Sequence, residues 1–269
     1  MFTFIKKKWC MIIIMVALLV VFGIYENNAL TTSSYTIDLG LTSGYKIVQI
    51  SDLHNKSFGD RNSKLVEKIV EARPDSICIT GDVVDASHTD TQVSIDLVKQ
   101  LVKVAPVYYV TGNHERALQS NIYTSMEEAF VANGVHVINN QMMDINGELQ
   151  IIGLDDRSQS VDDFTLETVV SSGDKEKKTI LLAHEPQLFD KYVSSGVQLL
   201  LSGHAHGGQV RIPFMEIGIV APNQGFFPQY TSGVFRKNGT SMVVSRGLGN
   251  SILPLRIFNR PEVVEITIE

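Results

Sequence analysis

Polar side chains follow five apolar stretches of the sequence, at the point where each stretch ends. They are Asp52 and His54 after "KIVQI", Asp82 and Asp85 after "SICIT", Asn113 and His114 after "VYYV", His184 after "ILLA", and His204 and His206 after "LLLSG". Five of the seven histidines of the chain fall at these ends. Imidazole, carboxylate and amide oxygen without thiolate suit borderline divalent ions such as Mn, Fe, Co, Ni or Zn better than calcium.

The number of such groups predicts two ions rather than one. A buried cluster of carboxylates and imidazoles would be costly without cations to satisfy it. Two ions about 3.5–4 Å apart that share a bridging carboxylate are the arrangement that clamps an in-line phosphoryl displacement. His204 and His206 have one residue between them, so on an extended strand end their rings point the same way and each can reach a different ion.

The elements that must position these residues alternate between short apolar runs and segments of helical period. "YKIVQI" precedes "NSKLVEKIVEA", "SICIT" precedes "SIDLVKQLVKV", and "VYYV" precedes "YTSMEEAFVAN". This alternation predicts an α/β sheet, and the carboxyl ends of its strands converge on one rim where ligands bind. The second half is richer in strands, ending in "EVVEITI", and predicts a second sheet packed on the first.

The order D-x-H, G-D-x-x-D, G-N-H-E, a lone H and G-H-x-H over about residues 45–210 resembles the calcineurin-like metallophosphoesterase family. The tail, with "GHAHGGQVRIP", "SRGLG" and "RPEVVEI", is similar to a bacterial membrane-anchored phosphodiesterase branch, some of whose members hydrolyse UDP-2,3-diacylglucosamine. The resemblance implies a four-layer α/β/β/α sandwich over residues 45–269.

The resemblance also implies a role for each polar residue. It assigns Asp52, His54 and His206 to the first metal, Asn113, His184 and His204 to the second, and Asp82 to a bridge between both. His114 is then the general acid that protonates the leaving oxygen, and Asp85 orients its imidazole and raises its pKa. The nucleophile is a hydroxide that bridges two divalent ions, among which we favour Mn.

The N-terminus is predicted to be a membrane anchor over residues 1–30. Three lysines, Lys6 to Lys8, precede seventeen residues without a charged side chain, Trp9 to Tyr25. No clear A-x-A cleavage site follows, so an uncleaved anchor is favoured over a cleaved signal peptide that would release a secreted protein. The lysines should stay in the cytoplasm, which places the rest of the chain outside the cell membrane. Residues 31–44 are expected to form a polar tether and the first strand region.

The net charge of the chain argues against one class of partner. A net charge of -6 shows no basic surplus, so nucleic acid is not an expected partner.

Cys10 lies in the apolar segment and Cys78 in a strand-like run, so no disulfide is expected and Cys78 should be a small core residue. His88 is expected in a surface loop and His136 on a strand away from the site.

An apolar loop follows the last metal motif, "IPFMEIGIVAPNQGFFPQYTSGVF". Its apolar residues either pack back on the core or form a hydrophobic cap beside the metals. In the second case Phe226 and Phe227 would receive an acyl chain or touch the bilayer. Arg246 in "SRGLG" could bind a substrate phosphate or make a structural salt bridge.

The expected activity is metal-dependent hydrolysis of a phosphodiester or pyrophosphate, on a lipid-linked or cell-envelope substrate. A pyrophosphatase of the UDP-2,3-diacylglucosamine type and a broad phosphomonoesterase remain alternatives, although that lipid precursor is cytoplasmic and the lysines point the domain outward. A catalytically silent metal-binding scaffold is disfavoured because every expected position is filled. The H-x-H-x-D-H cluster of metallo-β-lactamase-type enzymes is absent.

Overall fold

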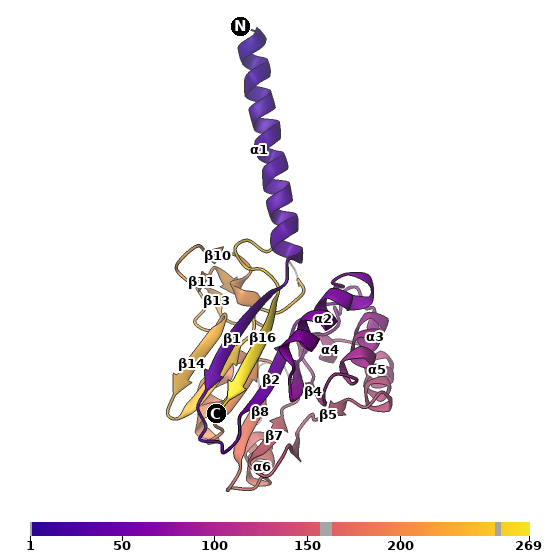
Figure 1. Cartoon of the computed structure of the whole chain (residues 1–269), viewed down its shortest axis with the longest axis vertical. Coiled ribbons are helices and arrows are strands. Elements are labelled where there is room, and N and C mark those ends of the chain that lie inside the picture. The colour runs from indigo at the N-terminus through magenta and orange to yellow at the C-terminus, as the bar shows by residue number, and fades with distance from the viewer. Residues whose placement is uncertain (1, 157–162, 251–253) are drawn as a thin grey trace.

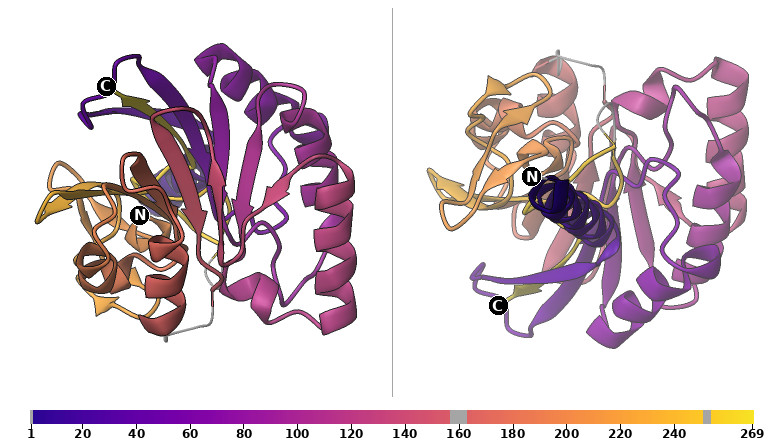
Figure 2. Two further views of the ribbon diagram at one scale, coloured as in Figure 1. Left: turned by 90° about the horizontal axis from the view of Figure 1, so that it is seen from below. Right: turned by 90° about the horizontal axis from the view of Figure 1, so that it is seen from above.

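Two six-stranded sheets stack face to face in the computed structural model, which describes residues 2–156, 163–250 and 254–269 (Figure 1). Helices cover the outer face of each sheet (Figure 2). The expected four-layer α/β/β/α sandwich is therefore confirmed, and a long N-terminal helix projects from one end of it (Figure 1).

The first sheet has the strand order β1-β16-β2-β3-β4-β5. Strands β2 to β5 are parallel, and β16 is antiparallel to β2 but parallel to β1. The strands are β1 (Thr31–Ile37), β2 (Tyr45–Ile50), β3 (Ser76–Thr80), β4 (Val107–Val110), β5 (His136–Val137) and β16 (Glu262–Ile268). The helices of this half are α2 (Ser63–Ala72), α3 (Thr91–Leu101), α4 (Asn113–Arg116) and α5 (Ser120–Ala132), with a short 3-10 turn at Asp60–Asn62.

The second sheet has the order β14-β15-β9-β8-β7-β6. Its four central strands are parallel and both edge strands are antiparallel. The strands are β6 (Gln141–Asp144), β7 (Leu149–Gly153), β8 (Lys178–Leu182), β9 (Leu199–Ser202), β14 (Gly233–Lys237) and β15 (Thr240–Val244). Its helices are α6 (Asp163–Ser171) and α7 (Phe189–Ser194), and 3-10 turns lie at Pro186–Leu188 and His206–Gly208.

Two small hairpins interrupt the chain between the sheet strands β9 and β14. One pairs β10 (Arg211–Ile212) with β11 (Ile217–Gly218), and the other pairs β12 (Val220–Ala221) with β13 (Gly225–Phe226). They belong to the apolar loop that the sequence singled out, and they lie near the foot of the N-terminal helix (Figure 1).

Apolar side chains fill the three interfaces between the four layers. Ile47, Cys78, Ile151, Leu201 and Val264 are among the fully buried residues of the cluster that lies between the sheets. Separate clusters bury the inner faces of α2, α3 and α5 on one side and of α6 and α7 on the other. Strands covered on both faces must be apolar at nearly every position, which explains runs such as "SICIT" and "LLLS".

Within the segment 31–44, expected to hold a tether and the first strand region, residues Thr31–Ile37 form the edge strand β1. All seven residues of β1 pair with β16, so no free linker separates the N-terminal helix from the sheet. Thr and Tyr favour strands, and a sheet edge with one face in solvent accepts the polar alternation of "TTSSYTI". The strand β16, expected in the second sheet, belongs to the first, where it lies between β1 and β2.

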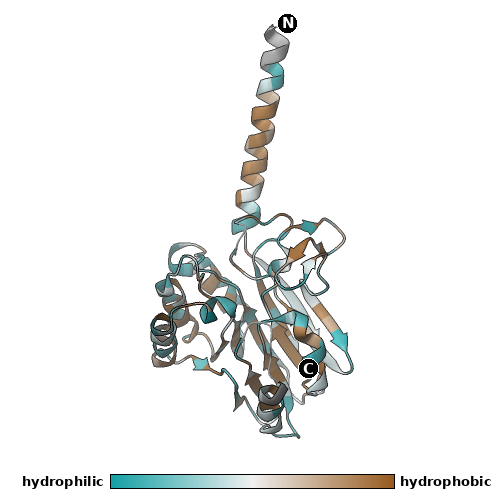
Figure 3. Cartoon of the chain, turned by 180° about the vertical axis from the view of Figure 1, so that it is seen from behind, coloured by the Kyte–Doolittle hydropathy of each residue, from teal (hydrophilic) through white to brown (hydrophobic). Residues whose placement is uncertain are grey.

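The N-terminal helix α1 spans Phe2–Asn28. Its segment Lys7–Asn28 is long and apolar enough to cross a membrane, by length and composition alone. A signal sequence would have the same length and composition. Figure 3 shows the apolar band along the middle of this helix, which stands clear of the sandwich.

Candidate metal centre

The residues predicted to bind metal gather where the carboxyl ends of strands from both sheets meet. Asp52 and His54 follow β2, Asp82 follows β3, Asn113 opens α4 after β4, His184 follows β8, and His204 and His206 follow β9. All are buried except Asn113, which is half-buried. Residues as far apart in the chain as Asp52 and His206 thus line one site.

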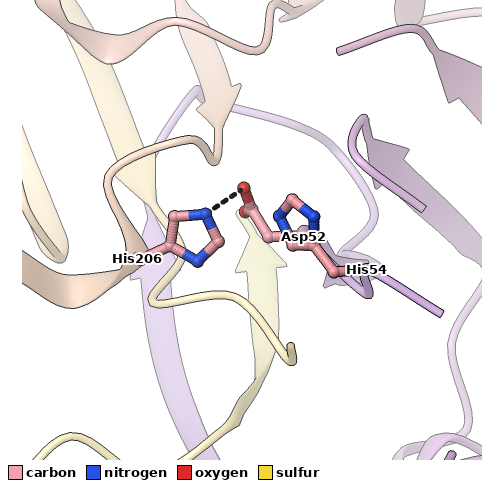
Figure 4. A group of neighbouring side chains, drawn as sticks. All are labelled: Asp52, His54 and His206. Atoms are coloured by element: carbon pink, nitrogen blue, oxygen red, sulfur yellow. Dashed lines mark ion pairs between the residues drawn. The ribbon is translucent and has the colours of Figure 1, made fainter. Parts of the chain in front are cut away.

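Three of these residues form a first group, shown in Figure 4: Asp52, His54 and His206. Their nitrogen and oxygen ligand atoms lie within 4.8 Å of one another. His206 Nε2 is 3.6 Å from Asp52 Oδ1, and the rings of His54 and His206 have centroids 4.9 Å apart.

The second group centres on His184. Its Nε2 lies 3.2 Å from Asp82 Oδ2, 3.2 Å from Asn113 Oδ1 and 3.2 Å from His204 Nδ1. Asp82 Oδ2 is also 3.7 Å from His54 Nε2 of the first group. Asp82 therefore lies between the two groups.

Hydrogen bonds behind the ligands fix how two of them are presented. His184 Nδ1 donates to the Thr80 carbonyl oxygen over 2.7 Å, which leaves Nε2 turned toward Asp82. The Asp52 carboxylate accepts the backbone N–H of His204 over 3.0 Å. The end of β3 is thereby tied to His184, and the turn after β2 to the backbone of His204.

The backbone turns sharply at these positions. Asp52, His54, Asp82, His204 and His206 have φ angles between 46° and 64°, the left-handed region that non-glycine residues rarely adopt. Each such residue costs on the order of 1–3 kcal/mol, and such strain clusters at functional sites. Five of the seven candidate ligands share this conformation, which is consistent with the tendency of such backbone to occur at functional sites.

Two glycines allow the turns to approach one another. A Cβ on Gly112 would collide with the Asp82 carboxylate, and a Cβ on Gly203 would collide with the Ser51 hydroxyl and the Asp52 carboxylate. Only glycine leaves room at these two positions.

The donor set and its burial fit divalent cations. Among the described residues, both ring nitrogens of His54 and Nδ1 of His206 are buried without a hydrogen-bond partner. Burial lowers the pKa of His54 to about 4 and that of His204 to about 3, and also lowers the pKa of His206. These imidazoles are neutral at physiological pH, which is the form that binds metal.

The carboxylates add negative charge that the site must balance. Burial raises the pKa of Asp52 to about 6. Burial also disfavours the charged form of Asp82, but the neighbouring His184 outweighs it and lowers the pKa of Asp82. Conversely, burial works against a charged His184, while Asp82 and Asp52 raise its pKa. The cluster therefore stabilises positive charge at its centre, as a cation site requires.

His114 lies at the edge of the cluster. Its ring meets that of His54 edge-on at 4.5 Å, and its backbone N–H donates to Asp82 Oδ1 over 2.8 Å. Its Nδ1 accepts the backbone N–H of Ala86 over 3.1 Å and lies 3.9 Å from Asp85 Oδ1. Asp85 is thus close enough for an ion pair but beyond hydrogen-bond distance, and its Oδ1 accepts the Ser87 N–H.

Two residues at the centre were not predicted to act there. Glu115 is fully buried and accepts the backbone N–H groups of Asp82, Val84 and Gly112. The G-N-H-E motif already contained it, so its place in the motif was the available signal. Asn223, at the β12–β13 turn, lies 3.2 Å from His204 Nε2, and no pattern in the sequence pointed to it.

The weaker candidates lie outside the two ligand groups. Arg246 forms a salt bridge with the buried Glu262 over 2.9 Å. This is the second of the two roles that the sequence left open for Arg246. Phe226 and Phe227 are exposed, at 77% and 67% of their surface. His88 is exposed in a loop, and His136 lies on β5 with its ring stacked on Tyr108.

The cysteines are as expected. Cys78 is fully buried in β3, and both it and Cys10 are free. The sandwich therefore depends on core packing rather than on disulfides.

Comparison with known proteins agrees with this geometry. A model of the family described as calcineurin-like phosphoesterase matches residues 45–208. The uncharacterized metallophosphoesterase YkuE of Bacillus subtilis (strain 168) is 32% identical over 257 residues, which cover 91% of this chain and 87% of that protein. An uncharacterized metallophosphoesterase of Aquifex aeolicus (strain VF5) is 27% identical, over 91% of this chain and 94% of its own.

Solved structures share the fold. A dimetal phosphatase from Danio rerio superposes with a TM-score of 0.50 and 12% identity, over 76% of this chain and 88% of its own. The protein TT1561 of Thermus thermophilus superposes with a TM-score of 0.50 and 12% identity, over 77% of this chain and 91% of its own.

Proposed function

Because the chain belongs to the calcineurin-like phosphoesterase family, a family of metal-dependent phosphoesterases, we propose that it hydrolyses a phosphodiester or pyrophosphate with two divalent ions. The observation that carries this proposal is the position of Asp82 between two ligand groups. A carboxylate in that position can bind both ions at once.

Each group would hold one ion. Asp52, His54 and His206 would bind the first, and Asn113, His184 and His204 the second, with Asp82 shared. The donor set is imidazole, carboxylate and amide oxygen, which suits Mn, our preferred metal, and also Fe, Zn, Co or Ni. When bound, such ions activate water at neutral pH and neutralise charge on the phosphoryl group.

His114 would supply the proton to the leaving oxygen. Its Nδ1 faces the Ala86 N–H, so Nε2 is the ring nitrogen that would face the leaving oxygen. Its backbone N–H is fixed by Asp82, which sets the position of the ring relative to the ligands. Asp85 Oδ1, 3.9 Å from His114 Nδ1, would help to hold the ring in this orientation.

The substrate we propose is a lipid-linked phosphoester of the cell envelope. The β12–β13 hairpin supports this, because its turn residue Asn223 contacts His204 while Phe226 and Phe227 are exposed beside it. An apolar surface next to the site would receive an acyl chain. A UDP-2,3-diacylglucosamine-type pyrophosphatase is a narrower form of the same proposal.

The location we propose is the cell membrane, with α1 as a single-pass anchor. Lys7 and Lys8 would remain in the cytoplasm and the sandwich would lie outside.

The reaction is tested with full-length protein in detergent, supplied with Mn. Hydrolysis of bis(p-nitrophenyl) phosphate is compared with that of p-nitrophenyl phosphate, for the native chain and for His114→Ala. We expect diester cleavage, and a loss of about 10²–10⁴-fold in the variant with its bound metal retained. Metal bound without cleavage of either ester would favour the scaffold alternative instead.

The lipid preference is tested separately by replacing both Phe226 and Phe227 with Ser. We expect slower hydrolysis of a long-chain lipid phosphodiester and an unchanged rate on the soluble diester. Val131→Ser, at another exposed apolar position, is the matched control. Equal losses on both substrates would count against the lipid proposal.

A further inference from the structure

We propose that the metal-bearing end of the sandwich is held against the membrane that α1 spans, with a rim of exposed apolar side chains inserted into its lipid. The rim consists of Phe214, Met215, Phe226, Phe227, Leu255 and Phe258. The inference rests on the proposed anchor and deepens the proposed function, since the substrate would be drawn directly from that leaflet.

The foot of α1 is fixed to the loops of the candidate site. Glu26 is buried and accepts the backbone N–H of Asn259 over 2.9 Å. The Asn259 side chain in turn donates to the carbonyl oxygen of the candidate ligand His206 over 2.7 Å. Lys56, two residues after His54, donates to the carbonyl oxygen of Asn27. The helix is therefore docked on the site from two sides.

Strand register places the ligands at the end of the sandwich nearest to α1. β1 begins at Thr31, three residues after α1 ends, and Thr31 pairs with Glu262. Two residues further along β16, Val264 pairs with Gln49 of β2. Because β2 runs opposite to β1, its carboxyl end, and with it Asp52, lies beside the start of β1. The carboxyl end of β2 thus lies at the end of the sandwich from which α1 projects (Figure 1).

Part of the rim touches α1 within its apolar stretch. The rings of Phe258 and Phe22 lie 5.3 Å apart, and Leu255 lies close to Gly23. Leu255 and Pro254 also line a groove of about 480 Å³ with Val16 and Leu19 of the helix. Side chains that contact the spanning part of a helix lie at the depth of the lipid.

The rest of the rim lies on the same face. Phe214 is fully exposed at the turn between β10 and β11, and it lines a hollow together with Glu26 and Phe258. The β12–β13 hairpin, which carries Phe226, follows the β10–β11 hairpin directly, and the backbone N–H of Phe227 donates to the carbonyl oxygen of Ile219 between the two hairpins over 2.9 Å. Exposed aromatic residues gathered on one face are typical of a surface that enters the lipid interface.

The depth of the rim is measured by fluorescence of the full chain in phosphatidylcholine nanodiscs. Trp9, the single tryptophan, is replaced by Phe, and one new tryptophan is placed by Phe214→Trp, Phe258→Trp or, as the control, Val131→Trp on α5. Nanodiscs with dibrominated lipid should lower the emission at 214 and 258 about twofold, since interfacial side chains lie roughly 5–10 Å into the headgroup and acyl boundary. Emission at 131 should not change.

Emission at 214 and 258 that is quenched no more than at 131 would overturn the inference. Phe214 makes the test robust, because a side chain that is fully exposed can be replaced without disturbing the core. Hydrolysis of bis(p-nitrophenyl) phosphate by the same nanodiscs separates the two proposals. Activity without quenching would refute the membrane rim alone, and quenching without activity would refute the proposed function alone.

Discussion

The side chains of the candidate centre are held by contacts that leave little free space. Five candidate ligands have left-handed backbone. Their turns approach one another closely because the glycines between them have no side chain. A small change in a residue that contacts the candidate ligands should therefore disturb metal binding as much as a change in a ligand itself.

Gly203→Ala should abolish metal binding and lower the free energy of unfolding by about 1–3 kcal/mol, because the added methyl overlaps the Ser51 hydroxyl and the Asp52 carboxylate. Urea denaturation and metal analysis measure both effects. Gly147→Ala is the control: it lies in open space and should change stability by no more than about 0.5 kcal/mol. Normal metal content in Gly203→Ala would contradict this account of the turns.

Glu115→Ala should lower the free energy of unfolding by about 3 kcal/mol, because three buried backbone N–H groups lose their acceptor. Replacement of the exposed Glu128 on the neighbouring helix should be nearly neutral. Thermal and urea unfolding of both variants provide the measurement. A Glu115 variant as stable as the native chain would show that these bonds are dispensable.

The sequence predicts the place of a single residue when the chemistry of its side chain and its position in an element point to the same site. His184, Asp82 and their partners combine a polar side chain with the end of an apolar run, so their gathering at one place was predictable. Asn223 was not, because its contact with His204 depends on how a loop folds back after β11.

Among the elements, the chain between β15 and β16 braces the site. The backbone N–H of Leu248 donates to the Ser51 carbonyl and that of Gly249 to the Asp52 carbonyl. Arg256, fully buried, donates to the carbonyl oxygens of Gly249 and Arg246. This segment joins the turn after β2 to the turn after β9.

Asn259→Ala should weaken the first metal site and spare the second. Its side chain holds the carbonyl oxygens of His206 and Gln209, and no candidate ligand of the second group bonds to it among the described residues. Loss of a residue that hydrogen-bonds to a metal ligand lowers metal affinity by about 10–100-fold. Titration with Mn should show one weakened and one intact site, whereas Asn133→Ala, at the end of α5, should show two intact sites. Equal weakening of both sites in Asn259→Ala would contradict the assignment.

The elements show where sequence patterns stop being sufficient. Runs such as "SICIT" predicted strands correctly because burial on both faces demands apolar residues throughout. The strand β1 was expected in part as a tether, since an edge strand tolerates polar residues. The place of β16 in the first sheet depends on pairing between residues more than 200 positions apart, which periodicity does not report.

For the whole molecule, the site, the apolar rim and α1 occupy one end. The two sheets share an apolar layer, so the ligands from β2 to β4 and from β8 and β9 are held at a fixed distance. Because α1 is docked rather than tethered, the site would also lie at a fixed distance from a membrane that α1 spans.

A flexible spacer of Gly and Ser inserted between Ala29 and Leu30, combined with Phe22→Ala and Glu26→Ala to remove the docking contacts of α1, should separate these functions. Such a linker behaves as a random coil and lets the sandwich leave the membrane surface. Hydrolysis of a soluble diester should be unchanged, while hydrolysis of a lipid phosphodiester in the same nanodiscs should fall by about tenfold as the effective concentration drops. Equal rates on the lipid with and without the spacer would refute a fixed position at the membrane.

Anomalous diffraction from crystals soaked in Mn would locate the bound ions. We expect two peaks about 3.5–4 Å apart, one beside His54 and His206, the other beside His184 and His204, with Asp82 between them. A single peak, or two peaks that Asp82 does not join, would contradict the shared dimetal centre.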